Sequence, residues 1–158
     1  MIKQIFKHLN LALLLCLVNG FLTISLALDK EKTFNVSRGD KLEISATHGN
    51  VNINIWAKDQ AYIKAINLDE ADLNDIKIEQ LSNKIIVEFN GKDSDDFSLE
   101  ISMPAYLNAD VSSGAGNITI NGNINGNVEL NTGGGNIITN DVGDKLDIST
   151  GGGNITVG

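Results

Sequence analysis

Three near-identical copies of one short segment occupy the last third of the chain and constrain its fold more than any other feature. Aligned on their glycines, the copies run over residues 109–118, 128–137 and 146–155, and in each an asparagine follows the last glycine: Asn117, Asn136 and Asn154. These asparagines are 19 and then 18 residues apart. A fixed period of this size is typical of proteins built from stacked repeats.

Each copy alternates apolar and polar residues before its glycines, as in Val128-Glu129-Leu130, which predicts a strand with one buried face. A second short strand, such as Ile155-Thr156-Val157, follows the asparagine. At about 3.3 Å per residue, one copy would close a loop of roughly 60 Å. The sequence therefore predicts an all-β fold, a narrow β-solenoid with rungs of about 17–19 residues.

The same pattern recurs nearer the N-terminus, where Asn50 follows Leu42 by the same eight residues. Between the two regions the pattern weakens, and Lys84 stands where the asparagine would be. The composition of residues 69–81 would also fit a short helix, but their β-branched residues favour a strand. We expect one domain over residues 28–158, with regular rungs over 107–158 and degenerate rungs over 54–106.

The first 27 residues predict a secretory signal peptide. Lys3 and Lys7 precede an almost wholly apolar run, and small residues favour cleavage after Ala27. A retained transmembrane anchor is the alternative, because the run approaches the length of a membrane span. Leu15 precedes Cys16 where lipoprotein processing requires a small residue, so that route is not expected. The chain is therefore expected to be exported, to the periplasm or the cell surface.

Charge and cysteine content exclude several classes of protein. The net charge is −8, and removal of the leader would leave ten basic residues against 20 acidic ones, or −10. A chain this acidic, without a basic patch, is a poor ligand for nucleic acid. Cys16 is the only cysteine, so the mature chain would have no disulfide and no thiol chemistry.

A family resemblance rests on residues 99–104, which read Leu-Glu-Ile-Ser-Met-Pro, on residues 111–120 and on the two further Gly-x-Gly-Asn-Ile copies. Together they resemble the bacterial putative-adhesin family, which is similar to the head domains of putative auto-transporter adhesins. The resemblance implies a right-handed, single-stranded β-helix with a surface role and no catalytic residues. Many members carry Asp where this chain has Asn.

Four asparagines at one turn position are predicted to form a structural ladder: Asn50, Asn117, Asn136 and Asn154. Side chains repeated at one level of a stack can hydrogen-bond along it. Three acidic residues, Asp110, Glu129 and Asp147, are expected to form an outward column with strand spacing of about 4.8 Å. That column is a weak candidate for a hard cation with oxygen ligands; a solvated acidic face is the alternative.

No catalytic residue, cofactor site or other metal site is predicted. His48, the only histidine of the mature chain, is expected to be an exposed turn residue, because a triad would require an orienting carboxylate and a nucleophile. The aromatic residues could stack on sugars if they shared an exposed face, but they are expected to cap the core instead: Trp56, Tyr62, Phe89, Phe97 and Tyr106.

The function predicted from these patterns is a non-enzymatic envelope or surface binding module whose ligand is a glycan or a protein. The first alternative is a structural or envelope-stress protein of the periplasm without a tight ligand. The second is a carbohydrate-active enzyme on a β-helix, which would require paired carboxylates in a cleft. The strand at Ile155-Thr156-Val157 is expected to present an unpaired edge, protected by a fold-back or used for self-association.

Overall fold

The computed structural model describes residues 28–91 and 96–158. The predicted leader lies outside the described residues. The described part contains one short 3₁₀-helix and a series of strands, in the order β1 (Leu28–Asn35), β2 (Lys41–Ala46), β3 (Asn50–Trp56), β4 (Gln60–Leu68), η2 (Asp72–Asn74), β5 (Ile76–Leu81), β6 (Lys84–Phe89), β7 (Ser98–Pro104), β8 (Asn108–Ser113), β9 (Ile118–Asn121), β10 (Val128–Thr132), β11 (Ile137–Thr139), β12 (Leu146–Thr150) and β13 (Ile155–Val157).

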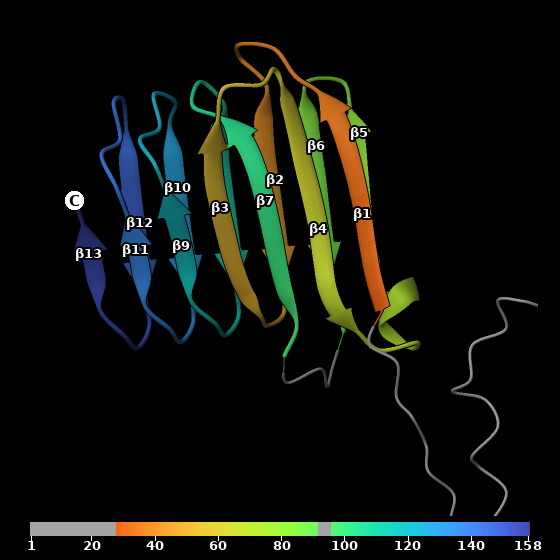
Figure 1. The fold of residues 1–158 in the computed structure, drawn as a ribbon. Coiled ribbons are helices and arrows are strands. Elements are labelled where there is room, and N and C mark those ends of the chain that lie inside the picture. Colours follow the sequence, from red (N-terminus) through yellow and green to blue (C-terminus); the bar gives the residue numbers. More distant parts are fainter. Residues whose placement is uncertain (1–27, 92–95) are drawn as a thin grey trace, which may run out of the picture.

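These strands form two sheets that face each other (Figure 1). Sheet A has the order β1-β4-β7-β3-β9-β11-β13, and sheet B has the order β12-β10-β8-β2-β6-β5. Inward apolar side chains of both sheets form one continuous core, which runs from Val36 to Ile137 and includes Phe89, Phe97 and Met103. The chain is therefore all-β, as the alternation predicted.

The three C-terminal copies lie on one another as parallel strands in both sheets. In sheet B, Val128 pairs with Ala109 on one side and with Leu146 on the other. In sheet A, Ile137 pairs with Ile118 and with Ile155. Equivalent residues of successive copies are thus direct neighbours, so any residue type repeated in the sequence forms a column on the sheet surface.

The N-terminal half departs from this pattern, and the predicted single-stranded right-handed β-helix is wrong. β4 pairs antiparallel with both β1 and β7, and β5 pairs antiparallel with β6. Only Ser82 and Asn83 connect β5 to β6, and Ser82 has a φ of 55°. So short a connection joins antiparallel strands, whereas parallel strands need a long crossover. The fold is two mixed sheets.

The degenerate rungs predicted over 54–106 are wrong in strand register as well as in strand direction. Ile85 pairs with Leu42 and Lys84 with Lys41, so Lys84 does not occupy an asparagine position. Residues 69–81 contain one 3₁₀ turn followed by β5, which combines the two alternatives that the composition left open. Among the described residues, no helix is long and apolar enough to cross a membrane.

Candidate binding groove and polar columns

Two polar columns run side by side across the outer face of sheet B. The acidic column contains Glu43, Asp110, Glu129 and Asp147, which are paired in register on the adjacent strands β2, β8, β10 and β12. The second, which we name the lysine–amide column, lies two residues earlier on the same strands or just before them: Lys41, Asn108, Asn127 and Lys145. Since side chains two residues apart on a strand share a face, the two columns face the same solvent.

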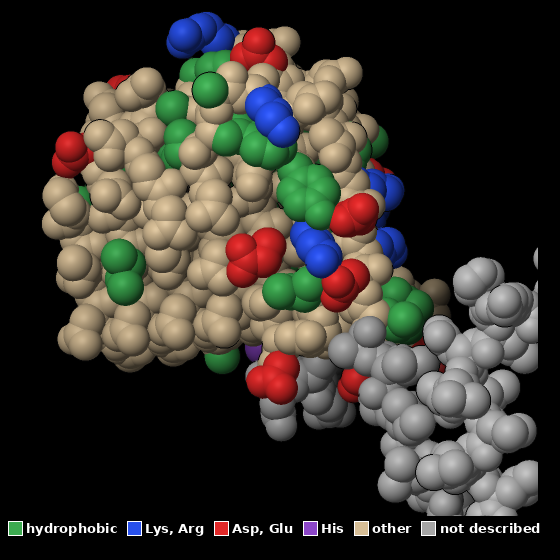
Figure 2. Space-filling view, viewed as in Figure 1, with side chains coloured by type: hydrophobic (Ala, Val, Ile, Leu, Met, Phe, Trp, Pro, Cys, Tyr) green, Lys and Arg blue, Asp and Glu red, His purple; other side chains and the backbone are tan. Residues whose placement is uncertain are grey.

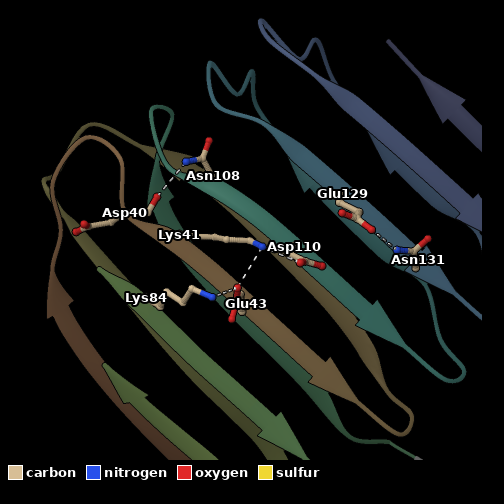
Figure 3. A network of polar contacts seen from close by, with 8 residues as sticks. All are labelled: Asp40, Lys41, Glu43, Lys84, Asn108, Asp110, Glu129 and Asn131. Atoms are coloured by element: carbon tan, nitrogen blue, oxygen red, sulfur yellow. Dashed lines mark hydrogen bonds and ion pairs between the residues drawn. The ribbon is translucent and has the colours of Figure 1, made fainter. Parts of the chain in front are cut away.

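Lys41 connects the columns at one end (Figure 3). Its Nζ lies 2.8 Å from Asp110 Oδ2 and 3.1 Å from Glu43 Oε1, and Lys84 Nζ lies 2.8 Å from the same Glu43 oxygen. The hydrogen bond to Asp110 raises the pKa of Lys41. Hydrogen bonds from Lys84 and then Lys41 lower the pKa of Glu43. Both acids at this end are thus neutralised by lysines.

The other end of the acidic column is less compensated. Glu129 accepts a hydrogen bond of 3.3 Å from Asn131 Nδ2, and no lysine pairs with it among the described residues. Lys145 approaches Asp147 only to 3.9 Å, and their side chains are 73% and 63% exposed. Glu129 therefore stands between two carboxylates, at a strand spacing of about 4.8 Å, and no cation of the described part of the chain pairs with it.

A shallow groove of about 250 Å³ lies between the columns over β8, β10 and β12. Three carboxylates (Asp110, Glu129 and Asp147), two lysines (Lys41 and Lys145) and two amides (Asn108 and Asn127) line it. The Oδ1 of Asn108 is already occupied, because it accepts a 2.9 Å bond from the Asn127 backbone N–H. The groove thus offers ammonium donors, carboxylate acceptors and neutral amides on one sheet face.

The predicted cation column lies inside this groove. In residues 28–91 and 96–158, no three His, Cys, Asp or Glu side chains converge closely enough to hold a metal ion. Asp110 is bonded to Lys41, and a bound cation would have to displace that ammonium group. At the Lys41 end, lysines therefore act as the counter-ions of the column.

The predicted asparagine positions form a chain of side-chain to backbone hydrogen bonds. Asn50 Oδ1 accepts from the Asn117 N–H at 2.9 Å, Asn117 Oδ1 from the Asn136 N–H at 2.8 Å, and Asn136 Oδ1 from the Asn154 N–H at 2.9 Å. Each amide thus satisfies a backbone donor of the next copy at the point where the turn ends. The asparagine side chains therefore cap the backbone of the neighbouring copy just before its second strand begins.

The glycine turns are held by a second set of contacts that the sequence analysis did not predict. Thr132 Oγ1 donates to the Gly116 carbonyl and Thr150 Oγ1 to the Gly135 carbonyl, both at 2.9 Å. A Cβ at Gly135 would lie 2.1 Å from the Gly116 carbonyl oxygen. At Gly134 it would meet nothing within 4 Å. Turn backbones therefore touch each other directly at some glycines and not at others.

His48 is half-buried, so the expectation of an exposed turn residue was wrong. Its ring meets Phe89 edge-on at a centroid distance of 5.2 Å, and its Nδ1 lies 3.2 Å from Thr47 Oγ1. Phe97 packs next to Phe89 as part of the core. His48 stands where the later copies have Gly134 and Gly152, and its ring is buried because it packs on Phe89. No carboxylate or nucleophile forms a triad with His48 among the described residues.

The remaining aromatic residues do not all share one exposed face. Phe89 and Phe97 are buried, whereas the Tyr106 hydroxyl directs its one hydrogen toward the Val36 carbonyl and Asp59 Oδ1, which lie 3.1 and 2.9 Å away. Trp56 Nε1 donates to the Gln60 carbonyl at 2.7 Å. On sheet A, charged side chains gather over β1, β4 and β7, and the face over β9, β11 and β13 is mainly uncharged (Figure 2). The Tyr62 hydroxyl donates to Glu31 Oε2. None of these four residues, nor Tyr62, lines the groove of sheet B.

The lysines and amides of the groove were missed at the sequence level, although a signal was present. Lys41, Asn108, Asn127 and Lys145 each directly precede the first apolar residue of their copy. Alignment on the glycines places these four at one position, so the repeat itself defines the second column.

No model of a known protein family matches the sequence, and no curated protein matches it. Solved structures of similar fold include a putative adhesin from Parabacteroides distasonis (16% identity, TM-score 0.48), covering 82% of this chain and 65% of that one. A putative lipid-binding protein from the same species has 16% identity and a TM-score of 0.42, covering 77% of this chain and 61% of that one. A putative cell adhesion protein from Clostridium sporogenes has 13% identity and a TM-score of 0.45, covering 82% and 99%.

This chain thus spans slightly less than two thirds of the length of both Parabacteroides proteins and nearly all of the clostridial one. The structural neighbours are named as adhesion or binding proteins. At such low identities and TM-scores these names assign no ligand, and the function has to be argued from the groove itself.

Proposed function

We propose that this chain is an exported, non-enzymatic binding module of the cell envelope or surface, and that the groove over β8, β10 and β12 holds a polar ligand, a glycan. The observation that carries the proposal is the convergence of both columns on that groove, with carboxylate, ammonium and amide groups at fixed register. Groups of this kind donate and accept hydrogen bonds to hydroxyls without requiring one net charge from the ligand.

The exposure of the groove supports binding over catalysis. Asp147 is 63% exposed, and Asp110 is 32% exposed and already bonded to Lys41. Glycoside hydrolysis needs one carboxyl group that remains protonated near neutral pH, which burial in apolar surroundings usually provides. The carbohydrate-active alternative retains one supporting observation, because in-register carboxylates on neighbouring strands stand about 4.8 Å apart at their backbones.

A glycan array run with a polysaccharide-cleavage assay tests the proposal. We expect saturable binding to a defined set of glycans and no cleavage. Asp147→Asn and Glu129→Gln should each weaken binding about tenfold, which corresponds to the loss of one charged hydrogen bond. Glu70→Gln is the matched control, because Glu70 is an exposed acid in the turn after β4, outside the groove.

Three outcomes would contradict the proposal in different ways. Cleavage that is lost in Glu129→Gln would establish the enzyme instead. Absence of any saturable glycan ligand would favour the structural or envelope-stress alternative. Binding that all three variants retain equally would show that the ligand sits elsewhere, for which the charged surface over β1, β4 and β7 would be the next candidate.

A further inference from the structure

The two ends of the paired sheets differ in how their edges are protected. At one end, β1 is the edge of sheet A and β5 is the edge of sheet B. Lys30 Nζ on β1 donates to the carbonyls of Leu73 and Ile76 at 3.2 and 2.8 Å, and Lys32 Nζ donates to the Ile78 carbonyl at 2.6 Å. Lysines that occupy edge carbonyls block the addition of another strand.

At the opposite end, no lysine of the described residues occupies the edge carbonyls. β12 and β13 each pair on one side only, with β10 and β11 (Figure 1). Ile155 and Val157 are 45% and 49% exposed, although the equivalent residues of the preceding copy, Ile137 and Thr139, are buried. Ile148 is half-buried, and its neighbour Leu130 is fully buried. The core therefore continues to this end, and the described residues leave its last layer exposed.

The last copy is nearly symmetric about Gly152, which lies four residues after Ile148 and four before Thr156. Ile148 and Thr156 thus stand at about the same height in the two sheets. A two-fold axis that runs perpendicular to both sheets, just beside these two residues, would place a second copy against this edge. β12 would then pair with β12 of the second copy and β13 with its β13, both as antiparallel strands. Ile148 would face its own equivalent in the core, and Ile155 would face Val157. We propose that a second copy of this chain covers this end in that arrangement.

The charges of this edge suit the arrangement. Around Ile148, Asp147 comes opposite Ser149 of the second copy and Lys145 comes opposite Gly151, so no two like charges stand directly opposite, where they would destabilise the pair. The two Asp147 carboxylates become diagonal neighbours, each with Lys145 of its own strand at 3.9 Å. Because lysines close the other end, association stops at a dimer instead of extending into a filament.

A single-cysteine experiment tests the geometry. In a Cys16→Ser background, Thr156→Cys places two thiols on the proposed axis, where opposite Cα atoms are about 4.5–5.5 Å apart, within the range that a disulfide spans. Mild oxidation should convert most of the protein into a covalent dimer. Thr119→Cys is the matched control, since Thr119 lies on the same outward row of sheet A but in β9, away from the edge; it should remain mostly uncrosslinked.

Sedimentation measures the association without a cross-link. The weight-average mass of the unmodified chain should rise with concentration from one chain toward two. Ile155→Lys should raise the dissociation constant at least tenfold, and Ile138→Lys should leave it unchanged because Ile138 is already 47% exposed outside the core. A thermal melt of each variant shows that it is folded.

Four results would overturn the proposal. They are a monomer at every concentration, equal cross-linking of Thr156→Cys and Thr119→Cys, association into species larger than two, and a dimer that Ile155→Lys leaves intact. If Ile155→Lys fails to fold, the cross-linking pair still decides the question. Glycan binding by the groove is measured separately, so its failure would not affect this result.

Discussion

Asn117 and Asn136 are joined by one hydrogen bond, in which the side-chain Oδ1 of Asn117 accepts the backbone N–H of Asn136 at 2.8 Å. The bond links two neighbouring copies at the point where the glycine turn becomes a strand. The amide is on the outside of the molecule, yet it replaces a water that this backbone donor would otherwise need. The repeated asparagine therefore acts between copies and not within its own turn.

Replacement of this amide should cost stability only where a following copy uses it. We expect Asn117→Ala and Asn136→Ala each to lower the free energy of unfolding by about 1 kcal/mol, the usual net value of one hydrogen bond. Asn154→Ala is the control, because no later copy donates to it among the described residues. Urea titration measures the differences. Equal losses at all three positions would show that the side chains act locally instead.

Two adjacent glycines should differ in how much stability the same substitution costs. Gly135 has a φ of 153° and its Cβ would lie 2.1 Å from a carbonyl oxygen, so Gly135→Ala should destabilise by about 1–3 kcal/mol. Gly134→Ala should change stability by less than about 0.5 kcal/mol, since that Cβ would meet open space. Ala115 already occupies the matching position of the first copy. Similar urea midpoints for both variants would contradict the turn stacking.

Two acids of the acidic column should have effects of opposite sign on stability. Glu43→Gln removes contacts to two lysines and should lower the thermal midpoint. Glu129→Gln relieves repulsion from Asp110 and Asp147 and should raise it, with each change worth roughly 0.5 kcal/mol. Because both effects are electrostatic and both carboxylates are accessible to solvent, 0.5 M NaCl should reduce the two changes in thermal midpoint. Changes of the same sign would mean that the local charge environment does not decide the outcome.

Stability should fall on acidification partly through Glu43. Hydrogen bonds from Lys84 and Lys41 lower its pKa in the folded state, so its contribution is present above the ordinary value of about 4.3 and disappears as the pH falls through the lowered value. Glu43→Gln should therefore flatten the pH dependence of unfolding below about pH 5. Parallel curves for Glu43→Gln and the original chain would refute this assignment.

Calcium should stabilise the chain no more than sodium does at matched ionic strength. Lys41 already occupies the space beside Asp110 and Glu43, which leaves Glu129 and Asp147 as exposed acids without a third oxygen ligand from the column. Thermal midpoints in calcium chloride and sodium chloride measure the difference. A clear rise with millimolar calcium that disappears in Glu129→Gln would restore the column as a cation site.

The sequence by itself determined the repeated part of this protein. The period of 18 or 19 residues and the two-residue alternation fixed which residues of the last three copies face the core and which become neighbours in a column. Glu129 therefore lies between Asp110 and Asp147 as the alignment predicts. Local residue pattern and repetition were enough to predict these neighbours, because each copy contacts almost only the copies next to it.

Only the tertiary structure decided the direction of the strands in the N-terminal half and the partners of the charged groups. β5 and β6 alternate like the later copies, but alternation has the same period in parallel and antiparallel strands and so cannot separate them. Lys84 reaches Glu43 across 41 residues of sequence, and Lys41 reaches Asp110 across 69, because β2 lies between β6 and β8. That order of strands, which no local pattern encodes, placed lysines at one end of the acidic column and, among the described residues, left Glu129 without one.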